Sequence, residues 1–134
     1  MQAILRKRVN NTKGVTLVEL LAVLVILGII ALIAVPAIAG VIDDSKENSI
    51  KSTAINTINA VELYMVTNSE DDPNKVSHSD IEGEYVKDRD GFNWTETPSF
   101  SLVDGEVAIS GEGSIDGTSV EFNNDTINDI NTMD

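Results

Sequence analysis

One acidic residue, Glu19, interrupts the most apolar stretch of this 134-residue chain. Residues 15–42 are otherwise apolar except for Thr16. A carboxylate placed in hydrocarbon costs roughly 2.5–3.5 kcal/mol on insertion scales. Ionisable groups in such segments usually have a partner and a function. Glu19 is therefore the leading candidate for a functional residue.

The apolar stretch is long enough to cross a membrane. As a helix, residues 15–42 would rise about 42 Å, and a bilayer core needs only about 20 apolar residues. Two residues disturb a regular helix here: Pro36 removes a backbone hydrogen bond, and Gly28 costs about 1 kcal/mol relative to alanine. A helix selected only for residence in lipid needs neither, so both are candidate kink positions.

The basic segment 1–14 does not look like an ordinary signal peptide. Such a peptide has its apolar core before the cut and small residues at the cut. Here Gly14 comes before the apolar stretch. A protease that cuts after Gly14 would leave the hydrophobic helix on the mature protein.

These features resemble the class III signal of type IV pilins and pseudopilins. The matching residues are Gly14, Val15, Thr16, Leu17, Val18, Glu19, Gly28 and Pro36. Val15 stands where the family most often has phenylalanine, although other apolar residues are accepted there.

The resemblance implies that residues 1–14 are a leader peptide. A membrane prepilin peptidase would cut between Gly14 and Val15, and the same enzyme would methylate the new amine of Val15. The resemblance also implies that Glu19, with Thr16 beside it, is the assembly site, and that residues 15–42 form the transmembrane and assembly half of a long helix.

A plain signal anchor is the simpler alternative. Glu19 lies only about 6 Å of helix rise beyond Val15, so its side chain would reach the membrane surface. This alternative does not explain why Gly14 stands directly before the Val-Thr-Leu-Val-Glu run.

The hydrophobic helix is expected to continue as an amphipathic half over residues 43–67. Apolar residues recur there at the spacing of one helix face: Ile50, Ala54, Ile58, Val61 and Met65. Glu47 and Lys51 form an i,i+4 pair in the favourable order. We therefore predict one helix over about 16–67, bent near Pro36.

Residues 68–98 are interpreted as a loop with a possible short strand at Tyr85–Val86. The run Asp88-Arg89-Asp90-Gly91 resembles a fragment of a calcium loop. It lacks the glycine and acid that an EF-hand requires at its sixth and twelfth positions, so a turn is favoured. Tyr85, Phe92 and Trp94 are expected to anchor the loop on the helix.

Residues 99–122 are predicted to form a small antiparallel sheet. Asp104-Gly105 between two alternating runs indicates a two-residue hairpin turn. That turn makes Leu102 face Val107 and Phe100 face Ile109, with all four side chains on one face. A second turn is expected over Gly111–Gly117 and a third strand over Thr118–Phe122, with Val120 and Phe122 pointing inward.

Residues 123–134 are interpreted as a polar tail that is disordered by default, although its acids could coordinate a cation. The predicted fold class is α+β: a long N-terminal hydrophobic helix packed against a small antiparallel sheet, as the pilin resemblance also implies.

No pattern typical of an enzyme is present. The chain has no cysteine, and its one histidine, His78, lies between serines with no apparent partner. No phosphate loop or zinc spacing occurs. We therefore expect no catalytic residues, cofactor or metal.

Charge is distributed in blocks. Residues 1–14 hold four bases and no acid, and the rest holds all 22 acids and five bases, a net charge of −17. Basic residues that flank a first membrane helix stay in the cytoplasm, so the acidic part is expected outside. The acidic surface disfavours direct binding of nucleic acid.

Two functions from different classes remain. The first is a structural subunit that polymerises after leader cleavage into a helical homo-oligomeric filament at the bacterial cell surface. Its expected partners are the prepilin peptidase/N-methyltransferase, the pilus assembly machinery and, before assembly, membrane lipid around a single-pass helix. The second is a membrane-anchored monomeric binding domain. Within the filament class, a competence (DNA-uptake) pilin and a type II secretion pseudopilin share the same N-terminal pattern.

Overall fold

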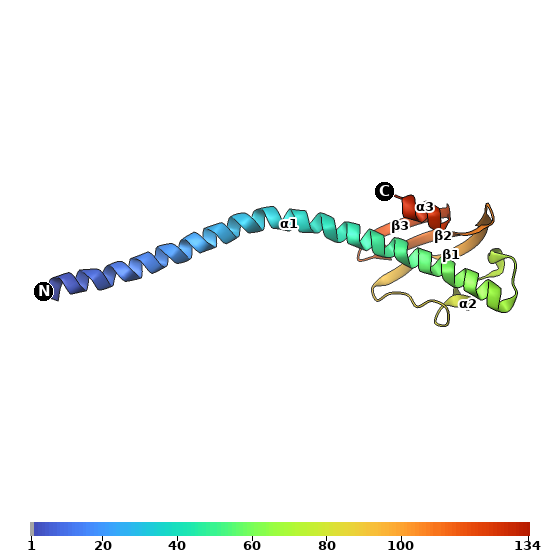
Figure 1. Cartoon of the computed structure of the whole chain (residues 1–134), viewed down its shortest axis with the longest axis horizontal. Coiled ribbons are helices and arrows are strands. Elements are labelled where there is room, and N and C mark those ends of the chain that lie inside the picture. The colour runs from blue at the N-terminus through green and yellow to red at the C-terminus, as the bar shows by residue number, and fades with distance from the viewer. Residues whose placement is uncertain (1) are drawn as a thin grey trace. The chain divides into compact units, whose positions relative to one another are not determined.

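A computed structural model describes the backbone of residues 2–134 and the side chains of residues 16–134. It divides into two compact units, Met1–Val41 and Ile42–Asp134. The elements in chain order are α1 (Gln2–Asn68), a 3-10 helix η1 (Pro73–Lys75), α2 (His78–Ile81), β1 (Phe92–Val103), β2 (Glu106–Ile115), β3 (Thr118–Asp125) and α3 (Ile127–Thr132) (Figure 1). The three strands form one antiparallel sheet in the order β1-β2-β3. The predicted α+β class is confirmed.

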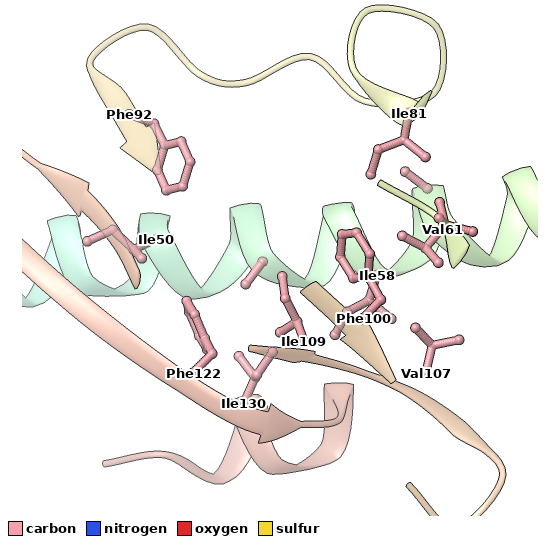
Figure 2. Packing of buried hydrophobic residues seen from close by; sticks show 13 residues of the cluster. Ile50, Ile58, Val61, Ile81, Phe92, Phe100, Val107, Ile109, Phe122 and Ile130 are labelled. Atoms are coloured by element: carbon pink, nitrogen blue, oxygen red, sulfur yellow. The ribbon is translucent and has the colours of Figure 1, made fainter. Parts of the chain in front are cut away.

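The part of α1 in the second unit presents its apolar stripe to the sheet. Ile50, Ala54, Ile58 and Val61 are fully buried, and Met65 is partly buried. The sheet contributes Phe100, Ile109 and Phe122 to the same core (Figure 2). This confirms the stripe predicted from i, i+3 and i+4 spacing, because residues at that spacing lie on one face of a helix. The predicted Glu47–Lys51 ion pair is also present, at 2.9 Å.

The predicted hairpin is confirmed. Leu102 pairs with Val107 and Phe100 pairs with Ile109. The turn residues Asp104 and Gly105 both have positive φ, 52° and 86°, as the favoured two-residue turn requires.

The four side chains of the hairpin are not equally buried. Phe100, Val107 and Ile109 are buried, but Leu102 is 51% exposed. Leu102 borders a surface hollow together with Met65 and Val66 of the last turns of α1. The helix therefore covers the sheet near Phe100 but leaves the end of the hairpin open.

The loop predicted over residues 68–98 is shorter than expected, because β1 already begins at Phe92. The strand absorbs Pro98 with register shifts between Trp94 and Glu96 and between Glu96 and Ser99. β1 is an edge strand, and proline, which lacks an amide hydrogen, is tolerated at edges and bulges.

The rest of that loop is held on the domain by buried or stacked side chains. Pro73, Val76 and Ile81 are buried, and the rings of Tyr85 and Tyr64 are 5.6 Å apart. In place of the possible strand at Tyr85–Val86 there is a single bridge between Val86 and Glu82.

The turn predicted over Asp88–Gly91 is present. The amide of Phe92 donates to the carbonyl oxygen of Arg89 at 3.0 Å. Gly91 has φ +84°, a conformation that favours glycine.

The prediction of a turn over the whole of Gly111–Gly117 is wrong. β2 continues to Ile115, and the turn is made by Asp116 and Gly117 alone. Gly113 is needed for a close approach within the strand. A Cβ there would lie 2.8 Å from Cε2 of Phe92 and 3.1 Å from Cγ2 of Ile50.

The C-terminal residues are ordered, which corrects the predicted tail. β3 extends to Asp125, and α3 follows with Ile130 only 1% exposed. A capping box starts α3: the amide of Thr126 donates to Oδ2 of Asp129 at 3.0 Å, and the amide of Asp129 donates to Oγ1 of Thr126 at 3.3 Å. The apolar pattern in the sequence of α3 was short, with only Ile127 and Ile130 at helical spacing.

The prediction that Val120 and Phe122 of the third strand point inward holds in part: Phe122 is buried and Val120 is partly buried.

Candidate functional site

From Leu17 to Val41, the helix of the first unit is apolar on all sides except at Glu19. Its large side chains are exposed around the whole circumference, as for Leu24 at 57% and Leu32 at 77%. Within the part of the chain that the structure describes, α1 is the one helix long and apolar enough to cross a membrane. None of its most apolar window is buried against the rest of the protein. Because a helix with apolar residues all round needs apolar surroundings, this segment must be covered by lipid or by other helices.

Glu19 projects from this helix. It is exposed, as is Thr16 three residues earlier, and residues at that spacing are neighbours on a helix surface. Among residues 16–134, no side chain forms an ion pair with the Glu19 carboxylate. Ionisable residues in apolar segments usually have a partner, so the assembly role assigned to Glu19 stays a prediction.

Gly28 and Pro36 lie inside the helix, which continues through both residues. A Cβ placed on Gly28 would meet nothing within 4 Å, so the fold of one chain does not require glycine there. Pro36 has no amide hydrogen, so it cannot donate to the carbonyl of Leu32 as a regular helix requires. The kink role assigned to Gly28 and Pro36 stays a prediction.

Two of the predicted site residues, Gly14 and Val15, fall outside the residues whose side chains are described. Their predicted roles in cleavage and methylation stay predictions.

His78 has partners that the sequence did not indicate. Its Nε2 lies 3.8 Å from Oδ2 of Asp88, and its Nδ1 lies 3.9 Å from Oε2 of Glu82. The ring also meets the ring of Trp94 at a centroid distance of 6.0 Å. The fold brings Asp88 and Trp94 to His78 from 10 and 16 positions away, which the sequence did not indicate, but the buried Nε2 of His78 has no hydrogen-bond partner among the described residues.

The cluster is partly buried within the loop. Burial raises the pKa of the Asp88 carboxyl above its ordinary value, and the neighbouring His78 opposes that rise. Of the two adjacent hydroxyls, the Oγ of Ser77 donates to Asp80 at 2.6 Å and lies 2.8 Å from the Oγ of Ser79. Among residues 16–134, no hydroxyl is hydrogen-bonded to His78, so the pair activates no nucleophile there. Nor do the described residues contain a group of three or more side chains arranged to bind a metal ion.

Comparison with known families bears on the N-terminal residues. The model of the prokaryotic N-terminal methylation motif matches residues 9–35. That motif is the class III prepilin signal. The chain carries the signal of type IV pilins and pseudopilins. The matched range includes Gly14, Val15, Thr16, Glu19 and Gly28, and it ends one residue before Pro36.

The prepilin signal supports a pilin-like structural subunit with a membrane-anchoring helix and implies processing by a prepilin peptidase. The comparison of the chain with curated proteins gave no match, and the comparison with solved structures gave none either. The match to the prepilin motif covers residues 9–35 only, so it does not extend to the α+β domain beyond them.

Proposed function

We propose that this chain is a subunit that polymerises into a type IV pilus-like filament at the bacterial cell surface after its leader is removed. The observation that carries the proposal is Glu19, a lone carboxylate on a helix that is otherwise apolar on all sides and directly follows a prepilin cleavage signal.

Leader removal supplies the missing cation. Before cleavage the nitrogen of Val15 is part of a peptide bond, and cutting after Gly14 converts it to an amine. An incoming subunit then offers this amine to Glu19 of the subunit ahead. Pairing is stronger in a low-dielectric environment than in water, and an unpaired carboxylate there is costly. The pair therefore fixes the axial position of each new subunit.

The remaining apolar surface of residues 15–42 is then covered by the same segment of neighbouring subunits. Gly28 and Pro36 provide a weak place where the helix bends or unwinds as it leaves lipid. The acidic domain stays outside the membrane.

Competence pili and type II secretion pseudopili use the same N-terminal helix, so the arrangement around Glu19 supports all three kinds of filament equally. Neighbouring genes for a secretion pore, for DNA uptake or for a retraction ATPase distinguish them. Membrane-anchored monomers without filaments would favour the alternative of a monomeric binding domain.

The test compares Glu19→Ala, Glu19→Asp and a control, Glu121→Ala, that removes an exposed carboxylate from β3. Filament yield is measured in sheared surface fractions, and processed protein is measured in membranes. We expect Glu19→Ala to be inserted and cleaved but to polymerise poorly, Glu19→Asp to be intermediate because its carboxylate reaches less far, and the control to be normal. Normal filament yield from Glu19→Ala would remove this mechanism.

A further inference from the structure

A hollow of about 500 Å³ lies where α1 ends beside the β1–β2 turn. We call it the acidic groove. Its lining includes Glu62, Met65, Val66, Glu70, Asp71 and Leu102. Val66 is 80% exposed and Leu102 is 51% exposed, so the groove presents bulky apolar side chains to solvent. A second hollow of about 350 Å³ shares Glu62 and Val107 with it, and Glu106 adds another acid there.

The groove is strongly negative. The last turn of α1 contains no basic residue, so nothing there offsets the negative end of the helix dipole. Lys75 lies 3.0 Å from Glu70, but among residues 16–134 neither Glu62 nor Asp71 forms an ion pair. The groove therefore favours an occupant that carries positive charge on a partly apolar stem.

A basic segment precedes β1, and its Arg89 reaches the other end of the domain helix. Lys87 and Arg89 are both exposed, and Arg89 Nη1 donates to Oγ of Ser49, where α1 enters the domain, at 3.3 Å. Asp88 between them is directed toward His78, which leaves Asp90 as the exposed acid in this turn. We call residues 87–89 the basic loop.

The other bases of the domain are less available. Lys51 is paired with Glu47, and Lys75 is paired with Glu70. Among the described residues, only Lys46, Lys87 and Arg89 are bases outside the ion pairs within the chain. Exposed free bases are therefore few in a strongly acidic domain, and two of them lie in the basic loop.

The separation of the two surfaces decides which molecule fills the groove. Ser49 and Val66 are 17 residues apart on α1, which is about 25 Å along the helix axis. Arg89 lies within side-chain reach of Ser49, so it cannot reach the groove of its own chain. A second copy displaced along the helix direction can reach it.

From this arrangement we infer that the basic loop of one subunit docks in the acidic groove of the next, head to tail. The inference rests on the proposed filament and names a contact between its outer domains. Such a contact uses different surfaces on the two partners, so it repeats from subunit to subunit and propagates a fibre when the rotation between subunits does not close a ring. Exposed ion pairs contribute little energy each, so contact with Val66 and Leu102 supplies most of the stabilisation and the charges set the orientation.

Cysteine cross-linking tests the contact directly, because the chain has no cysteine of its own. Val66→Cys and Arg89→Cys are combined in the full-length chain, and its filaments are oxidised. A disulfide needs Cα atoms about 4.4–6.8 Å apart, so these two positions cannot be bridged within one chain. We expect a ladder of covalent dimers, trimers and longer species on a non-reducing gel.

The matched control combines Val66→Cys with Thr95→Cys, an exposed position on β1, and should give no ladder. Filaments at normal yield without a Val66–Arg89 ladder would overturn the docking and leave the filament function standing. Absence of filaments from the unmodified chain would overturn both.

Charge reversal provides the second test. Glu62→Lys with Asp71→Lys, or Lys87→Glu with Arg89→Glu, should each lower filament yield about tenfold, the effect of roughly 1.4 kcal/mol. Combining all four changes restores the net charge of the chain. The groove is then basic and the loop is acidic, so the two surfaces are again complementary and filament yield should recover. Processed protein in membranes, measured alongside, shows whether each variant is made and inserted. Failure of the fourfold variant to recover would contradict the docking.

Discussion

The Nζ atom of Lys51 lies 2.9 Å from the carbonyl oxygen of Met133, a residue 82 positions later in the chain. The same atom lies 2.9 Å from Oε1 of Glu47, and the Lys51 side chain is only 12% exposed. One lysine thus joins the end of the chain to α1 beside the core that contains Ile130.

Replacing Lys51 with methionine keeps the apolar stem and removes both polar contacts. We expect the free energy of unfolding to fall by about 1–3 kcal/mol, because hydrogen bonds from charged groups contribute in that range. The matched control Glu47→Gln removes only the ion pair, and it should cost less than about 1 kcal/mol. Denaturant unfolding of the detergent-solubilised protein, followed by Trp94 fluorescence, measures both, and equal losses would contradict the role given to Met133.

The hairpin offers a comparison between buried and exposed positions on one face of the sheet. Phe100→Ala and Ile109→Ala should lower stability by roughly 3–5 and 2–5 kcal/mol, because each leaves a cavity in the core. Leu102→Ala should cost much less, since that side chain is half exposed. The same unfolding assay ranks the three variants. A large loss for Leu102→Ala would mean that the end of the hairpin is covered within one chain.

Gly113→Ala should destabilise the domain by about 1–3 kcal/mol, the usual range for an overpacked core. The added Cβ would lie 2.8 Å from Cε2 of Phe92. Phe92→Leu removes the obstructing ring, so the double variant should lose less than the sum of the two single changes. Additive losses from the two changes would show that the clash is not the cause. Gly117→Ala is a useful contrast, because its strain comes from φ +85° and no atom lies within 4 Å of the added Cβ.

Stability should depend on pH through Asp129. Its hydrogen bonds with the amide and then the hydroxyl of Thr126 hold the pKa of this carboxyl below its usual value. A carboxyl whose pKa is lowered by folding contributes stability above its unfolded pKa, near 4, and that stability is lost as the pH falls through the folded pKa. In a plot of the free energy of unfolding against pH, Asp129→Asn should therefore lose less stability on acidification than the native chain; this low-pH fall is the acid limb of the stability curve.

Asp88 should act with the opposite sign. Burial raises the pKa of its carboxyl, so protonation favours the folded state as the pH falls. Asp88→Asn should make the acid limb of the stability curve steeper. If both substitutions changed the limb in the same direction, one of the two pKa directions would be wrong.

Cleavage should depend on the size of residue 14. Gly14→Val should leave the leader on the protein, because a narrow protease subsite no longer accepts the side chain. Intact mass spectrometry should show the native chain beginning at a methylated Val15, and should show the variant beginning at Met1. A native chain that retains residues 1–14 in cells with an active prepilin peptidase would contradict the cleavage prediction.

The parts of the fold that were predicted from the sequence are those with a strong local pattern. The stripe from Ile50 to Val61 repeats at helical spacing, and Asp104-Gly105 is a turn signal between two alternating runs. The prepilin signal is local too, so Gly14 and Glu19 were recognised without a structure.

The missed features depend on contacts between distant residues. Gly113 suggests a turn when it is read locally, and only the rings and side chains opposite it, from Phe92 and Ile50, explain a glycine within a strand. α3 is too short for its pattern to stand out, and it is ordered because Ile130 reaches the core. His78 appeared isolated because Asp88 joins it only in the folded loop.

The all-round apolar surface of residues 17–41 has a consequence for how subunits would recognise each other in the proposed filament. Such a helix has no preferred side, so lipid leaves it free to rotate about its own axis. A neighbouring helix meets nearly the same surface at every rotation angle. Contacts between these hydrophobic segments would therefore hold subunits together but would do little to fix the rotation of one helix relative to its neighbour. In that filament, Glu19 would define one axial position and one side of the helix. The rest of the rotational orientation of each subunit would be set by contacts of the folded domain.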